Sequence, residues 1–545
     1  MSAAVEEPLP RPRLRLSIPL RTARLLAAAG LAALLVVDAI LLVNAVRVVS
    51  AGRAAIADPF ELDFAEGLVL APTRALSAGR SIYPPAGDSP ALISNYTPVY
   101  YAAAAALGTA VGDHLAAGRA LSLASTVLAA LVLTLLAWRA IEPASGRRGR
   151  GLAAVGAGLG FLQISYTATF AALMRVDLLA VLLAFSGVLV FGATAARGRR
   201  VYWCLAPFLL AAYTKQTTVA AAAACILTAS RRSLRRGIAL AGALAGAAAL
   251  AGGALQLGTH GGFAFHVITA NLHPYNWDQT ASFLQDVAIR YPVLVALALA
   301  TVPQLLASLP REGAADESAP AAARAWTRAA LGAYLPLAAL TSLTVGKLGA
   351  EVNYLIEPLG VICVCAAVAV GDALRWSDSA DAADAMHAGG RTLASIAVPA
   401  LLLWQVVGLA PPKTVELIET PPADEQARVA ALVDLVRRVD GPVLSEDLTL
   451  LSLAGKPILF QPCDIAQLIY RHVRDEAPWV EALERGDFRL VVLRFDVRHP
   501  PPLAFARFTP AMIEAIRTRY VPSPSAASGY WVYVPGASPR PEVAS

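Results

Sequence analysis

The sequence predicts a polytopic α-helical membrane protein with a small α/β domain at its C-terminal end. Of its 545 residues, 57 % are hydrophobic and only 15 % are charged, whereas soluble domains carry about 25 % charged residues. Long apolar runs recur between residues 25 and 411, and runs of ~20 apolar residues are typical of membrane-spanning helices. Beyond residue 424, short strand-like and helix-like stretches replace these runs.

The first apolar segment is expected to be a retained span. A basic stretch, residues 1–24, precedes it, and the segment is longer than the core of a signal peptide. We therefore expect the N-terminus to be cytoplasmic and the chain to be a multi-pass protein of the cell membrane. The candidate spans are 25–47, 98–113, 118–138, 151–165, 176–195, 202–213, 217–230, 237–257, 291–308, 329–345, 354–371 and 393–410.

Clusters of arginine set the expected topology. They lie in the short connections at 147–150, 197–200 and 231–236, and cytoplasmic loops are enriched in Lys and Arg. All three clusters are cytoplasmic only if residues 98–138 cross the membrane once. This arrangement predicts about 11 crossings, within a range of 11–13, and makes segment 98–113 re-entrant or half-length. One further crossing elsewhere in the chain would explain the same charge pattern.

The domain organisation follows from this topology. A transmembrane domain is expected over residues 25–411, with outer loops at 48–97 and 258–290. A Pro-rich linker, 412–424, leads to an α/β domain over residues 425–545, which we expect to be extracytoplasmic. In this domain residues 427–436 show helical periodicity, and the stretches GPVL, PILF, FRLVVLRF and YWVYVP resemble strands.

Composition also excludes several classes of function. The net charge is +6, but the basic residues are scattered among short loops, so no continuous basic face indicates a nucleic-acid partner. The five cysteines show neither a disulfide framework nor zinc-ligand spacing. No metal-binding motif appears among the histidines, and we expect no cofactor, while a requirement for a divalent metal is left open.

Three carboxylates in the first outer loop are the first candidates for chemistry. The stretch ELDFAEG holds Glu61, Asp63 and Glu66 close to the end of the first apolar segment. Partial desolvation at a membrane boundary raises a carboxylate pKa and makes the group a better general base. The alternative is that these acids are ordinary solvated charges. Arg80 and Tyr96 lie further along the same loop and are candidate substrate contacts.

Charged groups at span ends form a second set of candidates. Charges within membrane spans are costly and tend to be functional. Cations on the same rim as a carboxylate suit a reaction at a phosphorylated lipid, because the cations hold the phosphate while the carboxylate deprotonates an acceptor. Snorkelling side chains or structural ion pairs are the alternative. The candidates are Arg175, Asp177, Lys215, Lys347 and Asn353.

Two other regions have two interpretations each. The loop 258–290 is rich in aromatic residues and histidines, including His273, which either contact the substrate or form an interfacial aromatic belt. In the C-terminal domain, Glu446 and Asp447 follow a short strand and either recognise the acceptor or cap a helix.

The order of several motifs resembles the GT-C superfamily of integral-membrane glycosyltransferases, most of all its polyprenyl-phosphate-sugar-dependent branch of protein mannosyltransferases and lipid A aminoarabinose transferases. The resemblance covers about residues 20–410. The matching motifs are LDFAEG (Asp63, Glu66), YTPVYY, GRALSLAS (Gly118, Arg119), MRVDLLA (Arg175, Asp177), YTKQT (Lys215, Gln216) and EVNYLIEP (Asn353, Tyr354).

The resemblance implies a hexosyl or pentosyl transferase. In that family a first-loop acid is the base on the acceptor hydroxyl, which makes Asp63 the first candidate and Glu66 the second. The donor is a sugar on a polyprenyl monophosphate, the acceptor is a glycan, lipid or protein, and the product is an inverted glycoside. The adjacent Asp-Glu pair common in the family is absent here, so the motif does not decide which acid is the base.

Two other functions compete with a transferase. One is a transporter or flippase of lipid-linked sugars, and the other is a noncatalytic membrane scaffold that carries an outer domain. Transporters usually show inverted repeats and charged sites at the membrane midplane. The sequence shows no such repeat, and its charges lie at span ends.

Overall fold

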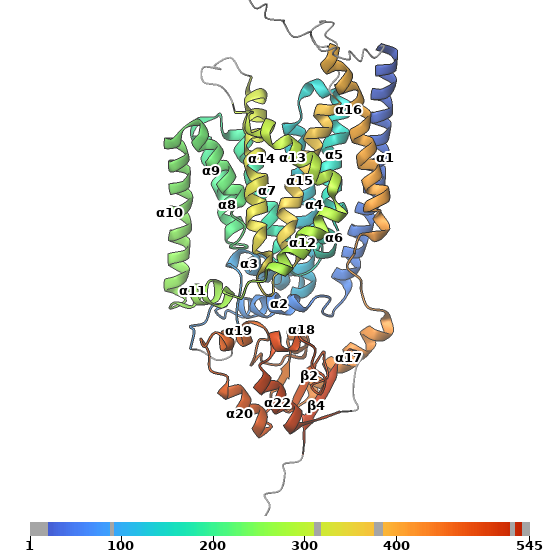
Figure 1. The fold of residues 1–545 in the computed structure, drawn as a ribbon. Helices are drawn as coiled ribbons and strands as arrows, with labels where there is room; N and C mark the ends of the chain where they lie inside the picture. The colour runs from blue at the N-terminus through green and yellow to red at the C-terminus, as the bar shows by residue number, and fades with distance from the viewer. Residues whose placement is uncertain (1–19, 88–91, 310–317, 375–384, 524–528, 537–545) are drawn as a thin grey trace, which may run out of the picture.

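The computed structural model describes residues 20–87, 92–309, 318–374, 385–523 and 529–536. A bundle of helices forms the larger part, and a smaller unit of mixed helices and strands adjoins one end of it (Figure 1). We call this smaller part the C-terminal unit, residues 423–523 and 529–536. Most of the expected cytoplasmic segment 1–24 and the end of the chain, 537–545, lie outside the described residues.

The bundle combines long helices with short ones. The long and intermediate helices are α1 (Leu20–Ala57), α4 (His114–Ala140), α5 (Arg147–Gln163), α7 (Asp177–Thr194), α9 (Ala220–Arg232), α10 (Leu234–Gly258), α13 (Pro292–Leu306), α14 (Ala319–Ser342), α15 (Ile356–Ala373) and α16 (Ala385–Trp404). The shorter or peripheral helices are α2 (Phe64–Ser77), α3 (Pro98–Val111), α6 (Ser165–Phe170), α8 (Leu205–Ala212), α11 (Gly262–Val267) and α12 (Trp277–Arg290).

The predicted class, a polytopic helical membrane protein, is confirmed, but the number of spans is smaller than expected. Among the described residues, six helices are long and apolar enough to cross a membrane, or seven if α12 and α13, bent by 95°, form one span. The expected count was about 11. Several apolar segments form helices that are too short to count, such as α9 with 13 residues, since ~20 residues are needed for a crossing.

The half-length helix expected at 98–113 is present. Helix α3 has 14 residues and is capped at its C-terminal end by Gly112, whose φ of 84° is the left-handed conformation that glycine adopts easily. Asp113 then caps α4 by accepting hydrogen bonds from the backbone of Leu115 and Ala116. This Gly-Asp pair turns the chain sharply, so segment 98–113 ends where a full span would continue.

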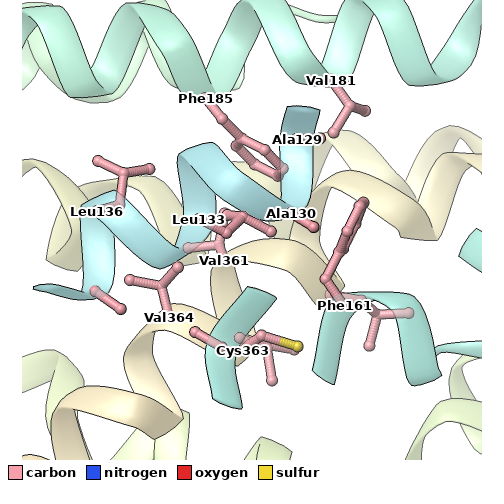
Figure 2. Close-up of a cluster of buried hydrophobic side chains, with 14 of the residues drawn as sticks. Ala129, Ala130, Leu133, Leu136, Phe161, Val181, Phe185, Val361, Cys363 and Val364 are labelled. Atoms are coloured by element: carbon pink, nitrogen blue, oxygen red, sulfur yellow. The ribbon is translucent and has the colours of Figure 1, made fainter. Parts of the chain in front are cut away.

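The centre of the bundle is packed from α4, α5, α7 and α15 (Figure 2). Lipid provides no hydrophobic driving force between helices, so membrane bundles depend on small residues that allow close approach. A Cβ on Gly158 would lie 2.4 Å from the Ala130 carbonyl oxygen, and one on Gly360 would lie 2.5 Å from the Phe185 ring. The Ala- and Gly-rich composition therefore permits this packing.

The arginine clusters gather at the end of the bundle away from the C-terminal unit. Helix α10 reaches α11 beside that unit (Figure 1), and its other end begins at Leu234, within the cluster 231–236. There Arg236 donates to the carbonyl of Ala195, just before the cluster 197–200. At the start of α14, Arg324 forms an ion pair with Glu142, 3.0 Å apart, close to the cluster 147–150.

The C-terminal unit is a small α/β structure. Its helices are α17 (Ala423–Arg438), α18 (Leu448–Ala454), α19 (Asp464–Tyr470), α20 (Ala477–Arg485), α21 (Ala504–Arg507) and α22 (Pro510–Arg519). Its strands are β1 (Val443–Ser445), β2 (Leu490–Leu493), β3 (Tyr520–Pro522) and β4 (Trp531–Pro535), in the order β1-β2-β4-β3. Strands β1 and β2 are parallel and the other pairs are antiparallel. All four residues of β2 are buried, which matches its apolar sequence LVVL.

One strand prediction is wrong and one strand was missed. PILF, residues 457–460, forms no strand, and Phe460 instead stacks on Phe508 in the core with ring centroids 5.4 Å apart. Pro457 begins this stretch and Pro462 follows it, and proline cannot donate a hydrogen bond to a neighbouring strand. Strand β3 has only three residues, too few for an alternating pattern.

The C-terminal unit packs directly on the first loop and α2 (Figure 1). Thr449 of α18 donates a hydrogen bond to Glu61, 3.0 Å away, and Arg74 of α2 donates to the Ser452 carbonyl. A Cβ on Gly67 would lie 2.8 Å from the Thr449 backbone nitrogen, so only glycine permits this approach. The first loop is thereby held between the bundle and the C-terminal unit.

Candidate functional site

A cavity of about 220 Å³ lies where the bundle meets the C-terminal unit. Its walls come from the first loop and the start of α2, the segments just before α7, α9 and α15, the loop 258–290, and the C-terminal unit. Six residues that the sequence pointed to as substrate contacts line it: Tyr96, Arg175, Lys215, His273, Lys347 and Asn353. The fold thus brings together polar groups that are up to 257 positions apart in the chain, from 96 to 353.

Asp63 lies beside this cavity, paired with Arg175. As the residue that caps α2, Asp63 accepts a hydrogen bond from the Ala65 backbone, and its Oδ1 lies 2.7 Å from Arg175 Nη1. Its side chain is 23 % exposed. It also lines an open groove of about 650 Å³, whose other wall is segment 413–419. Asp63 therefore faces the groove while its partner Arg175 faces the cavity.

A second carboxylate orients the cations. Asp177, the first residue of α7, accepts from Lys215 Nζ at 2.6 Å and from Asn353 Nδ2 at 2.9 Å. Lys215 also lies over the Tyr354 ring, 3.9 Å from its centroid. Asp177 lies behind the cavity wall rather than in it. It is buried together with its two partners, which fixes their side chains at the cavity surface.

Several polar atoms of the cavity wall have no partner. In the described part of the chain, five buried side-chain atoms of lining residues make no hydrogen bond: Asn95 Oδ1, Arg175 Nε, Gln216 Oε1, His273 Nδ1 and Asn353 Oδ1. Buried polar atoms in proteins are nearly always paired with protein or water. Burial also raises the pKa of the Tyr96 phenol well above its ordinary value, so this group stays a neutral donor. These features suit a polar ligand.

Glu66, the second candidate base, is enclosed in the protein. Its side chain is 0 % exposed, and Arg119, equally buried, binds it through Nε at 2.8 Å and Nη2 at 2.6 Å. The backbone nitrogens of Leu62 and Met174 donate to the same carboxylate. Arg119 also donates to three backbone carbonyls of the first loop. Glu66 thus lines neither the cavity nor the groove, and its contacts hold the first loop to α4.

Glu61 and Arg80, two further candidates, also lie outside the cavity. The Glu61 side chain is 2 % exposed and contacts Thr449 and Arg494 of the C-terminal unit. Burial and the neighbouring Asp447 raise the pKa of Glu61 well above its usual value. Arg80 follows the end of α2, where it is exposed to solvent and contributes to neither wall.

Other lining residues gave no signal in the sequence. Asp464 accepts from Asn95 at 2.9 Å and lies 3.5 Å from His273 Nε2, and Arg507 closes the cavity from α21. Both belong to the C-terminal unit, where no pattern joined them to the distant motifs. Only their three-dimensional placement shows that this unit forms part of the cavity wall.

The loop 258–290 divides between structure and surface. His266 accepts from the Ser94 backbone at 3.1 Å, and its other ring nitrogen lies 2.9 Å from the Pro84 carbonyl. Burial lowers the pKa of His266 to about 4, so it is neutral and ties this loop to the first loop. Trp277 is 71 % exposed, as an interfacial aromatic residue would be.

The two acids after β1 have structural contacts. Asp447 Oδ1 accepts from the Leu450 backbone at 2.7 Å, which confirms a helix cap. Glu446 is buried against Arg507. Among the described residues, no group of three or more His, Cys, Asp and Glu side chains is arranged to hold a metal ion.

Comparisons with known proteins bear on the fold. No family model matches this sequence, and no curated protein matches it. The crystal structure of ArnT from Cupriavidus metallidurans bound to undecaprenyl phosphate is similar, with a TM-score of 0.54 and 14 % identity over 91 % of this chain and 98 % of that one.

Two other solved structures show weaker similarity. Archaeal oligosaccharyltransferase AglB from Archaeoglobus fulgidus, in complex with an inhibitory peptide and a dolichol-phosphate, has a TM-score of 0.49 and 11 % identity, over 93 % of this chain and 74 % of that one. Arabinofuranosyltransferase AftD from Mycobacteria has a TM-score of 0.44 and 16 % identity, over 96 % and 40 %. The similarity to ArnT shows that this chain shares the fold of that structure.

Proposed function

We propose that this protein is a glycosyltransferase that moves a sugar from a polyprenyl-phosphate-linked donor to an acceptor hydroxyl. The observation that carries the proposal is the Asp63–Arg175 pair, which joins an open groove to a buried cavity lined by cations. The GT-C fold shared with ArnT, which was solved with undecaprenyl phosphate, supports this class of donor. Fold alone does not determine function, so the proposal rests on the site.

The cavity suits the phosphate and sugar of the donor. Arg175, Lys215 and Lys347 lie on its walls, and Lys347 forms no ion pair with any described residue. When the bond between the sugar C1 and the phosphate oxygen breaks, negative charge develops on the phosphate. Preorganised cations in a site shielded from water stabilise such charge strongly. The unpaired polar atoms of Asn95, Gln216 and His273 are suited to sugar hydroxyls.

Asp63 is suited to be the base. An acceptor hydroxyl that enters through the groove meets this carboxylate, which takes its proton while the acceptor oxygen forms a bond to C1. Attack from the face opposite the departing phosphate inverts the configuration at C1, and the products are the glycoside and the lipid phosphate. Arg175 holds the carboxylate in a fixed orientation. Glu66 positions the loop from which Asp63 projects.

The orientation in the membrane follows from the arginine clusters. They gather at the end of the bundle opposite the cavity, and the positive-inside rule assigns that end to the cytoplasm. We therefore propose that the cavity and the C-terminal unit are extracytoplasmic. The acceptor is then a glycan, lipid or protein of the cell envelope. Charges at the end of a bundle, rather than at its midplane, favour an enzyme over a transporter.

The test is an Asp63→Asn variant in a strain that lacks the chromosomal copy of the gene. Asn caps helices as well as Asp does, so the fold should be retained. Removal of a general base lowers turnover about 10²–10⁴-fold. Mass spectrometry of envelope glycolipids and glycans should show a sugar that wild-type protein adds and Asp63→Asn does not.

Asp113→Asn is the matched control. Asp113 caps α4 in the same way as Asp63 caps α2, but it lines neither the cavity nor the groove. This variant should restore the glycan fully. If Asp63→Asn restores it as well, Asp63 is not the base. If no glycan depends on the wild-type protein, the proposed transfer itself is refuted.

A further inference from the structure

We infer that the C-terminal unit supplies a ligand for the carrier phosphate, Arg507, and that Glu446 holds this arginine in position. The inference rests on the proposed function, because it assigns a residue to the phosphate end of the same cavity. It goes beyond the cations at the ends of the spans, since it makes the C-terminal unit part of the binding site.

The placement of Arg507 is the first support. It ends the short helix α21 and lines the cavity together with Leu503 and Ala506 of the same segment. Its guanidinium lies over the ring of Phe64, 4.1 Å from the centroid. Phe64 directly follows Asp63, so a residue of the C-terminal unit packs against the segment that carries the proposed base. The Arg507 side chain is 17 % exposed, which leaves it open to the cavity.

Glu446 fixes this side chain. Its carboxylate is fully buried, with one oxygen bound by Arg507 Nη1 and the other by the Arg494 backbone nitrogen. Among the described residues, no other side-chain hydrogen bond engages Arg507, so its remaining N–H groups are available. The planar arginine fork is well suited to phosphate oxygens. Glu446 is thus a positioning residue that does not line the cavity.

Lys347 of the bundle and Arg507 of the C-terminal unit line the same cavity. Cys463 lies in the cavity wall together with both cations. Lys347 Nζ contacts only Asn271 Oδ1, 3.4 Å away, among the described residues. The lipid phosphate released by transfer is a monoester with about −1.5 to −2 charges near pH 7, which two cations in one cavity wall would match.

The test measures binding of undecaprenyl phosphate and of the uncharged alcohol undecaprenol to the purified full-length protein in nanodiscs. Wild-type protein should prefer the phosphate. Arg507→Gln should weaken phosphate binding about 10–100-fold, as expected for loss of a charged hydrogen-bonding partner, and leave undecaprenol binding unchanged. Arg498→Gln, at an exposed arginine of the same unit, removes an equal charge and should have no effect.

Two further variants separate binding from folding. Arg507→Gln leaves Glu446 buried without its partner, so the double variant Arg507→Gln/Glu446→Gln removes both charges and should show the same loss of phosphate binding. Glu446→Gln alone should weaken phosphate binding less and keep its dependence on salt. If the folded double variant keeps the wild-type preference for phosphate, the inference is overturned while the proposed function stands. If wild-type protein itself binds both lipids equally, the proposed donor class fails.

Discussion

Two ion pairs that begin three residues apart in the first loop have opposite surroundings. Glu66 and Arg119 are both 0 % exposed, and two backbone nitrogens complete the hydrogen bonding of the carboxylate. Asp63 and Arg175 form an equally short pair, but Asp63 is 23 % exposed, and Arg175 Nε, 3.8 Å from Asp177 Oδ2, makes no hydrogen bond although it is buried. The first pair is closed and the second is open to a ligand on both sides.

The difference shows how a chain can use the same chemistry for structure and for function. A buried ion pair contributes little net stability over an apolar pair, but loss of one partner is severe because the other is left as an uncompensated charge. An accessible pair is free to exchange its partner for a substrate. The two pairs should therefore respond differently to the same substitution.

The largest effect on stability is expected from Glu66→Gln. This change leaves the Arg119 guanidinium buried without a counter-ion, which costs about 3–5 kcal/mol. Thermal unfolding in detergent, followed by size-exclusion fluorescence, should show a marked fall in Tm and in yield. The protein that does fold should keep its activity per molecule. A stable but inactive variant would contradict the structural role of Glu66.

Arg175→Gln makes the corresponding change in the open pair, with a smaller expected effect on stability. Asp63 is partly hydrated, so the loss should be about 1–3 kcal/mol, that of a charged hydrogen bond. Activity should fall more than stability, because Asp63, the proposed base, loses its orientation and the cavity loses a cation. Comparing turnover with Tm for this variant and for Glu66→Gln tests the distinction. If the ratio of lost turnover to lost Tm is the same in both variants, the distinction between the two ion pairs is refuted.

The contact between the first loop and the C-terminal unit should depend on pH through Glu61. Its folded-state pKa is raised above the ordinary 4.5 by burial and by Asp447. A raised carboxyl pKa gives stability that is complete below pH 4.5 and is lost as pH rises through the folded value. Limited proteolysis between α17 and α18 should therefore speed up as pH rises above 4.5. In Glu61→Gln this dependence should largely disappear, whereas an unchanged profile would assign it to another group.

The smallest effect is expected from Arg80→Gln. The sequence made Arg80 a candidate substrate contact, but it is exposed and lines neither the cavity nor the groove. Exposed substitutions away from special features usually change stability by no more than about 0.5 kcal/mol. Glycan analysis and Tm should both match the wild type. A clear loss of transfer would show that the ligand extends beyond the cavity.

The sequence predicted the class of fold well because composition and apolar runs report on the membrane directly. It predicted which cations converge, since Arg175, Lys215 and Lys347 all occur at span ends. It failed to separate Asp63 from Glu66, because their difference depends on Arg119 and Arg175, which are 53 and 112 positions away. It also missed Asp464 and Arg507, because the packing of a whole unit on the first loop leaves no local pattern.

The contact between Thr449 and Glu61 also constrains how the protein matures. These two residues are 388 positions apart, and ribosomes add about 5–20 residues per second, so the first loop is made roughly 20–80 s before α18. Throughout this interval Glu61, Arg74 and Gly67 lack their contacts with the C-terminal unit, and the cavity lacks one wall. A nascent chain already inserted in the membrane therefore has an incomplete cavity. Completion of the C-terminal unit sets the moment at which a ligand can meet a finished cavity.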